Sequence, residues 1–228
     1  METPTILLHF GPLVLTSTVV ITWLLMALLV GVSWLVTRRL KLEPGRWQSV
    51  LEGAVLAMQD AIEAVAPGRA RMLLPYIGSL WLYLGLANLT GLVPGLHSPT
   101  AQLSVTSGLA LLVFLATHWY GIRAVGLLPY LRHYVQPNPI LLPFHVISEL
   151  SRTVALAVRL FGNIMSLEMA ALLVLLVAGL LVPIPILMLH VVEALVQAYI
   201  FGVLALVYIA GGLESQPALR LDVGDTST

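Results

Sequence analysis

Arg159, Asn163 and Glu168 are polar residues inside an apolar run that the sequence predicts to be a membrane helix. Arg159 lies in its middle, Asn163 follows one helical turn later, and Glu168 lies nine residues after Arg159. A guanidinium stays protonated under biological conditions, and placing one at the bilayer centre costs about 3 kcal/mol on insertion scales. A chain keeps such a residue there only if a partner charge or a water-filled cavity meets it. These residue types therefore indicate a fixed positive charge on an ion path.

The helical positions of the three residues decide which of them can interact. Arg159 and Asn163 are one turn apart and share a face. Glu168 lies ~13 Å further along the axis and roughly half a turn around it. Glu168 is therefore not expected to neutralise Arg159 within the same helix.

A second polar stripe lies on the last apolar run. His190, Glu193 and Gln197 have the spacing i, i+3 and i+7, which places them on one helix face. With Glu168, the first two are predicted to give a titratable lining from the outer side to mid-membrane. Near the start of the earlier run, Glu149 and Arg152 are three residues apart and are predicted to form an interfacial ion pair.

Each candidate also has a structural alternative. Arg159 could form hydrogen bonds to backbone carbonyls, and His190 could be a core histidine with its hydrogen bonds satisfied. Glu168 and Glu193 could pair with buried donors. Amide side chains commonly hold membrane helices together, so this alternative applies to Asn163 and Gln197. His118 and His133 are interpreted as interfacial residues, and Asn88 has no assignment.

Composition indicates an integral membrane protein. The 228 residues are 59% hydrophobic and 10% charged, whereas soluble domains carry about 25% charged residues. The net charge of zero suggests no nucleic-acid partner. The chain has no cysteine, which excludes disulfides and cysteine-ligated metals, and no cofactor is expected.

About five membrane helices and one amphipathic helix are predicted in a single membrane domain. The first apolar run is too long for a signal peptide, whose apolar region has roughly 7–15 residues. In the amphipathic stretch, apolar residues recur at helical spacing with acidic residues between them. This helix is interpreted as lying on the membrane surface or packing under the bundle, and the alternative is a solvated connector. The predicted elements are spans 13–36, 73–93, 103–122, 144–181 and 186–210, the amphipathic helix 47–66, and the polar tail 211–228, with a turn at Pro183 and Pro185.

Basic residues predict the orientation. With five spans and an outer N-terminus, the basic segments 38–46, 69–71 and 123–132 and Arg220 all lie on the cytoplasmic side. The opposite segments 1–12, 94–102 and 182–185 carry no Lys or Arg. The C-terminus is therefore expected in the cytoplasm.

The fourth span is too long to stand upright. Its 38 residues would extend ~57 Å as a helix, against ~30 Å for a bilayer core. Ordinary tilts of about 20° do not absorb this excess. The helix must either break near Gly162 or lie steeply slanted, and its composition favours the continuous, slanted helix.

Two motifs resemble subunit a of F-type ATP synthases, the stator subunit of a membrane rotor. The first is RLFGN at 159–163, preceded by Ser151-Arg152 and Leu156-Ala157-Val158, and the second is HVVEALVQAYIF, which contains His190 and Gln197. The resemblance covers the C-terminal half, and the slanted helix and the topology fit the rest.

The resemblance implies a role for each matching residue. Arg159 is similar to the family's essential arginine, which faces a carboxylate on each c subunit of the rotor ring. Glu168 and His190 are similar to the family's acidic residue and its partner on the last helix. Gln197 is similar to the glutamine beside the arginine, and Asn163 is the motif's asparagine.

The resemblance also implies partners and a location. The implied partners are the c-subunit ring, b-type peripheral stalk subunits, the other ATP synthase subunits, the lipid bilayer and a translocated proton or sodium ion. The implied role is non-catalytic ion translocation, with the chain in a bacterial inner membrane. Leu167 and Thr153 depart from the family, which often has a small residue and a proline there, and Glu193 has no clear counterpart.

Two rival functions remain from the residues alone. A self-contained channel or secondary transporter could use Arg159 as an anion site, although inverted repeats, which would support a transporter, are not evident. In a scaffold protein, the polar residues would only pair with one another.

Overall fold

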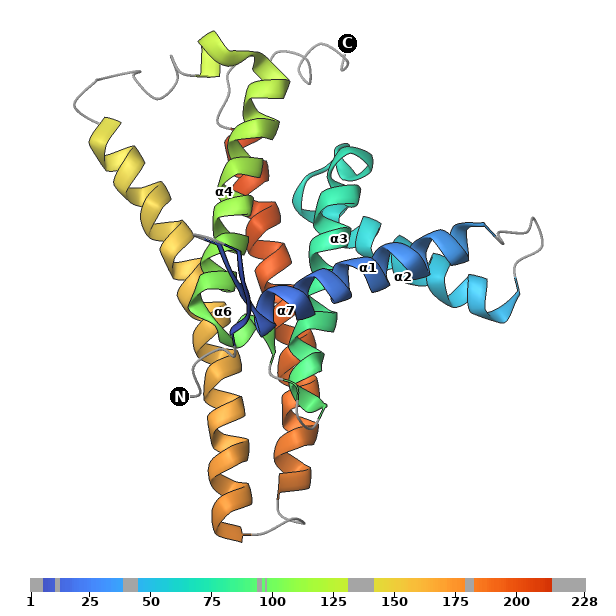
Figure 1. The fold of residues 1–228 in the computed structure, drawn as a ribbon. Coiled ribbons are helices and arrows are strands. Elements are labelled where there is room, and N and C mark those ends of the chain that lie inside the picture. The colour runs from blue at the N-terminus through green and yellow to red at the C-terminus, as the bar shows by residue number, and fades with distance from the viewer. Residues whose placement is uncertain are drawn as a thin grey trace.

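A computed structural model describes residues 6–10, 13–38, 45–93, 96, 98–130, 142–178 and 183–214 (Figure 1). Within them, helices dominate and the expected all-α membrane architecture is confirmed. The elements are β1 (Ile6–Phe10), β2 (Leu13–Thr16), α1 (Ser17–Thr37), α2 (Arg46–Val65), α3 (Ala70–Leu89), η1 (Thr90–Leu92), η2 (Pro99–Ala101), α4 (Leu103–Val125), α6 (Leu142–Ala178) and α7 (Pro183–Glu214).

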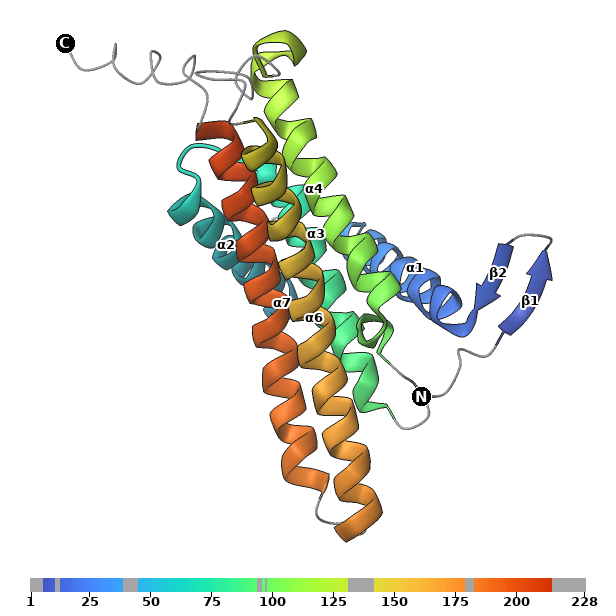
Figure 2. The same ribbon diagram turned by 90° about the vertical axis from the view of Figure 1, so that its left-hand side faces the viewer.

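Helices α3, α4, α6 and α7 form a bundle, and α6 and α7 are a long hairpin along it (Figure 2). The apolar core lies between these four helices, with fully buried side chains such as Leu84, Leu160, Ile164 and Leu206. Most other large apolar side chains face outward, as expected where lipid replaces water outside the bundle. The core fixes which face of α6 turns inward, and therefore where its polar residues lie.

A glycine allows α3 and α7 to meet closely. A Cβ on Gly202 would lie only 1.9 Å from Nε1 of Trp81, so any other residue would clash with the indole. That Nε1 donates a hydrogen bond to the carbonyl oxygen of Tyr199 at 3.2 Å, and the two rings stack with centroids 5.8 Å apart. This contact holds α3 against the part of α7 that carries Gln197.

Five described helices are long and apolar enough to cross a membrane, as predicted. The helix α6 has 37 residues without interruption at Gly162, so the alternative of a broken helix is wrong. In Figure 1, α1 runs across the long axis of the α6–α7 hairpin. The direction of α1 and that of the hairpin cannot both be the membrane normal. The five helical segments that could cross a membrane are Ser17–Thr37, Ala70–Leu92, Leu103–Ala124, Leu142–Val177 and Leu187–Leu213.

The N-terminal segment differs from the sequence prediction. Residues 13–16, predicted as the start of the first span, form β2, which pairs antiparallel with β1. Their run Leu-Val-Leu-Thr suits a strand, because β-branched residues fit a pleated surface. The remaining 21 residues of α1 still extend about 31 Å, enough for a bilayer core.

Both ends of α7 also lie beyond their predicted positions. Pro183 and Pro185, predicted to form the turn, belong to the first turn of α7, where a missing N–H costs no hydrogen bond. At the other end, residues 211–214 continue the helix, because Leu213 is buried in the core. The rest of the predicted tail and the predicted helical residues 179–181 lie outside the described residues.

The amphipathic helix is α2, and it packs against α3 and α7. Ile62 is fully buried there, and Met58 and Val65 are partly buried. Val50 and Val55, on earlier turns, are exposed. An interfacial position for this exposed apolar end stays a prediction.

Candidate ion-translocation site

The central residue of the site, Arg159, lies on the face of α6 that points away from the helix bundle. Its side chain is exposed, whereas those of the neighbouring Leu156 and Leu160 are buried. Within the described residues, the guanidinium makes no hydrogen bond or ion pair. The arginine thus points away from its own bundle.

Asn163 and Gln197 join α6 to α7 one turn beyond the arginine. Nδ2 of Asn163 donates a hydrogen bond to Oε1 of Gln197 at 2.7 Å. Gln197 is 1% exposed, and its Nε2 has no hydrogen-bond partner among the described residues. Buried polar groups in proteins are nearly always paired. The amide of Gln197 therefore has a donor that is available for a further partner, close to the level of Arg159 along the helices.

Glu168 lies on the opposite face of α6, as its half-turn offset from Arg159 predicts. Its Oε1 accepts a hydrogen bond from the backbone N–H of Ser98 at 3.0 Å. A Cβ on Gly91 would lie 2.9 Å from that oxygen and 3.4 Å from Cε1 of His190. Glu168 and His190 therefore border one small space that the glycine leaves open.

His190 is the most enclosed titratable side chain of this group. It is 1% exposed, and its Nε2 has no hydrogen-bond partner among the residues that the structure describes. A role for His190 in ion transfer, as opposed to that of a core histidine, stays a prediction.

A buried hydrogen-bond network supports this space from α3 and η2. Nδ2 of Asn88 donates to the carbonyl oxygen of Ala194 at 3.1 Å, and its Oδ1 accepts from Oγ1 of Thr100 at 2.7 Å. Oγ of Ser98 lies 2.6 Å from that hydroxyl and donates to the carbonyl oxygen of Ala87 at 2.9 Å. The network fixes the Ser98 backbone whose N–H meets Glu168.

Three further predicted residues, Glu193, Arg152 and Glu149, lie on α7 and α6. Glu193 is half-buried on α7 and has no hydrogen-bond partner in the described segments. The guanidinium carbon of Arg152 lies 5.4 Å from the ring centroid of Tyr208. Glu149 lies beside His118 of α4 at 3.7 Å, and its predicted pair with Arg152 stays a prediction.

Sequence reasoning missed four residues of this region, Asn88, Gly91, Ser98 and Thr100. Asn88 had no assignment, because nothing in its spacing indicates a hydrogen bond to Ala194. Ser98 acts through its backbone, which side-chain chemistry does not reveal. The signal that could have found them is the cluster of small polar residues between two spans on the side of Glu168.

Comparisons with known proteins agree with the motifs. The family model described as ATP synthase A chain matches residues 19–210. The chain is 61% identical to "ATP synthase subunit a 2" of Pelobacter propionicus over 96% of each chain. It is 62% identical to "ATP synthase subunit a 1" of Hahella chejuensis over 97% of this chain and 94% of the relative.

A third relative, "ATP synthase subunit a" of Legionella pneumophila, is 52% identical over 92% of this chain and 93% of its own length. These matches extend over nearly the whole chain, well beyond the RLFGN motif. They confirm the resemblance drawn from the sequence. The chain belongs to the ATP synthase A chain family.

Proposed function

We propose that this chain is the membrane stator subunit of a rotary ATP synthase and forms two ion half-paths against a ring of c subunits. The observation that carries the proposal is Arg159, an exposed guanidinium with no partner among the described residues. A charge in the membrane requires a partner or a water-filled cavity. A carboxylate on a neighbouring protein meets that requirement.

The surroundings of Arg159 suit a moving partner. Ala155 and Ser166 are exposed on the same face of α6, and a Cβ on Gly162 would meet nothing within 4 Å. Small side chains let membrane helices approach closely. A ring of small helical hairpins could therefore pass the arginine without displacing side chains.

The outer half-path is assigned to Glu168, His190 and Glu193, with Asn163 and Gln197 at its inner end. Glu168 and His190 share one space, and Gln197 retains a buried donor. These groups can transfer an ion from the outer side of the membrane to a ring carboxylate. The ion can be a proton or a sodium ion.

The charge of Arg159 explains why transport would turn the ring. A ring carboxylate that has bound an ion is neutral and can pass through lipid, whereas an ionised one would be heavily penalised. When it reaches Arg159, the positive charge favours the ionised form, and the ion leaves on the second side. The same charge blocks direct leakage between the half-paths. A potential of 100 mV supplies about 2.3 kcal/mol per charge, which ring rotation passes to ATP formation elsewhere.

The hairpin α6–α7 is proposed to lie steeply slanted in the membrane. If α1 spans upright, the hairpin that it crosses in Figure 1 must lie far from the membrane normal. A slanted hairpin also accommodates the 37 residues of α6, whose length exceeds an upright span. This orientation places Arg159 across the face of the ring.

The proposed location is a bacterial inner membrane, with the N-terminus outside and the C-terminus in the cytoplasm, from the positions of the basic residues. The proposed partners are the c-ring, b-type stalk subunits and the other ATP synthase subunits. The alternative is a self-contained channel or secondary transporter. The exposure of Arg159 disfavours this alternative, because a transporter places such a charge in its own cavity.

Co-purification tests the function against its rivals. Gentle solubilisation of native membranes should yield this chain with a ring of small hairpin subunits and with ATPase activity. A stator subunit requires those partners, whereas a transporter does not. Recovery of an active ion carrier consisting of this chain alone would contradict the proposal.

A further inference from the structure

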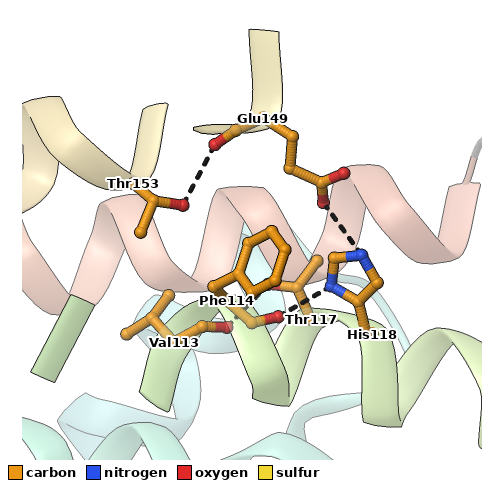
Figure 3. Close-up of polar contacts among 6 residues, drawn as sticks. All are labelled: Val113, Phe114, Thr117, His118, Glu149 and Thr153. Atoms are coloured by element: carbon orange, nitrogen blue, oxygen red, sulfur yellow. Dashed lines mark hydrogen bonds and ion pairs between the residues drawn. The ribbon is translucent and has the colours of Figure 1, made fainter. Parts of the chain in front are cut away.

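The helix α6 carries two carboxylates, and each lies beside a histidine from another helix. Glu168 borders one space with His190 of α7. Towards the other end of α6, Oε1 of Glu149 lies 3.7 Å from Nε2 of His118 on α4. Figure 3 shows this second pair, with the glutamate reaching from α6 to the imidazole.

The backbone decides which nitrogen of His118 can bind a proton. Nδ1 lies 2.8 Å from the carbonyl oxygen of Phe114, and a carbonyl oxygen can only accept. In the neutral imidazole Nδ1 therefore carries the hydrogen, and the lone pair is on Nε2. That lone pair is directed towards Glu149 (Figure 3), so a proton bound at Nε2 meets a carboxylate.

The His118–Glu149 pair is partly buried and remains accessible to solvent. The side chains of His118 and Glu149 are 27% and 20% exposed, and the Phe114 ring lies against the imidazole with centroids 4.3 Å apart. Oγ1 of Thr153 donates to the backbone carbonyl of Glu149 at 3.0 Å, and Thr117 donates to its own helix. Such a site can exchange protons with water while its geometry stays fixed.

Other titratable or charged groups surround the pair on each neighbouring element. The Tyr130 ring, just after α4, lies 5.9 Å from the His118 ring. On α6, the exposed His145 lies one turn before Glu149, and Arg152 lies over Tyr208 of α7. The exposed Arg123 is in the last turn of α4. Histidine is the group whose charge changes between pH 5 and 8, so His145 is the necessary comparison.

The two pairs flank Arg159 along α6. Glu149 lies ten residues before the arginine, ~15 Å along the axis, and Glu168 lies nine residues after it, ~13 Å. Ions that enter on one side of a blocking charge must leave on the other. The outer side has its titratable groups at Glu168 and His190, and the other side has them at His118 and Glu149.

We propose that the His118–Glu149 pair is the proton-exchange site of the second half-path, on the N-terminal side of α6. This inference rests on the proposed function. A ring carboxyl beside Arg159 breaks its O–H bond, and the proton passes through water to Nε2 of His118, leaving a ring carboxylate. The imidazolium is stabilised by Glu149 and then releases the same proton to water on that side. In ATP-driven pumping the steps run in reverse, and nothing is oxidised or reduced.

The test uses the whole complex reconstituted into vesicles with the ATPase head outside. ATP-driven proton pumping is measured for His118→Gln as a ratio to the unaltered complex, while the head-side pH is varied from 5 to 8. The ratio cancels the pH dependence of the head itself. We expect this ratio to change about tenfold across this range, because the variant lacks the imidazole that binds and releases the proton. The ratio should stay constant when only the lumenal pH is varied.

Two further variants separate this role from a structural contact. Glu149→Gln should change the same ratio, and the double variant should differ little from either single one, because the two residues act as a unit. Glu149→Asp retains the charge and serves if a variant assembles poorly. The matched control His145→Gln should give a flat ratio.

The outcomes are distinguishable from those that test the proposed function. A flat ratio for His118→Gln in assembled complexes, or an equal response from His145→Gln, would overturn the inference. Arg159→Ala is measured in the same vesicles. If Arg159→Ala abolishes pumping and His118→Gln is flat, only the second half-path is wrong; if Arg159→Ala pumps normally, the proposed function itself fails.

Discussion

Arg159→Ala is expected to abolish ATP-driven proton pumping while the chain remains assembled in its complex. Removing one preorganised charge-stabilising group typically costs 10²- to 10³-fold in rate, and here the same charge also separates the half-paths. The loss should be at least of that order. Pumping is measured by acidification of vesicles that contain the complex, and assembly by the amount of co-purified ring.

The variant is a clean test because of where the side chain lies. Arg159 is exposed and makes no hydrogen bond or ion pair within the described residues that a shorter side chain would break. Substitutions at such positions change stability by about 0.5 kcal/mol or less. Once the head is removed, passive leakage should persist or rise, because the barrier between half-paths is gone.

Arg159→Lys is the matched control for charge. Lysine supplies a positive charge, but burial can remove its proton, and it lacks the planar fork of donors. Pumping by this variant should be weak and above that of the alanine variant. Pumping by Arg159→Ala at the unaltered rate would refute the assignment of the arginine.

Glu168→Gln is expected to slow proton transport about tenfold or more, because positioned acid–base groups commonly contribute 10²- to 10⁴-fold. Glutamine has nearly the same shape, and its oxygen can still accept the hydrogen bond from the Ser98 N–H. The change therefore removes the titratable proton and leaves the local backbone in place. Initial rates of ATP-driven vesicle acidification report the effect.

Gly91→Ala tests the same space without removing the carboxylate. The added Cβ would lie 2.9 Å from Oε1 of Glu168, so the side chain must move away from its hydrogen bond. An intermediate decrease in rate is expected. If Glu168→Gln left the rate unchanged in assembled complexes, Glu168 would not be on the path.

The features that the sequence predicted well are those that follow from periodicity and from the free energy of burying charge. Five spans, one unbroken long helix and the opposite faces of Arg159 and Glu168 follow from hydropathy, the absence of an internal proline and 100° per residue. The hydrogen bond between Asn163 and Gln197 links the polar residues of α6 to the polar stripe of α7. The spacing of the polar residues within each helix was evident from the sequence.

The features that sequence reasoning missed depend on contacts between distant segments. The Ser98 N–H is a backbone donor, and its 70-residue separation from Glu168 leaves no periodic signal. Gly91 matters because it has no side chain. His118 was interpreted only as an interfacial residue. Its contact with Glu149 was missed, because only the packing of α4 against α6 brings the two side chains together. The strand β2 was missed because an apolar run of four residues suits either a strand or a helix.

Cross-linking tests the central claim most directly, that the Arg159 face of α6 meets a rotor ring. The chain has no cysteine, so single cysteines can replace Ala155, Val158 and Ser166, which are exposed on α6. The buried Leu160 provides the control. In native membranes containing c subunits with a single cysteine, disulfides should form at the exposed positions and not at residue 160, and ATP hydrolysis should redistribute them among ring subunits. Disulfides that form only within or between copies of this chain, with no adduct of a small subunit, would contradict the stator function.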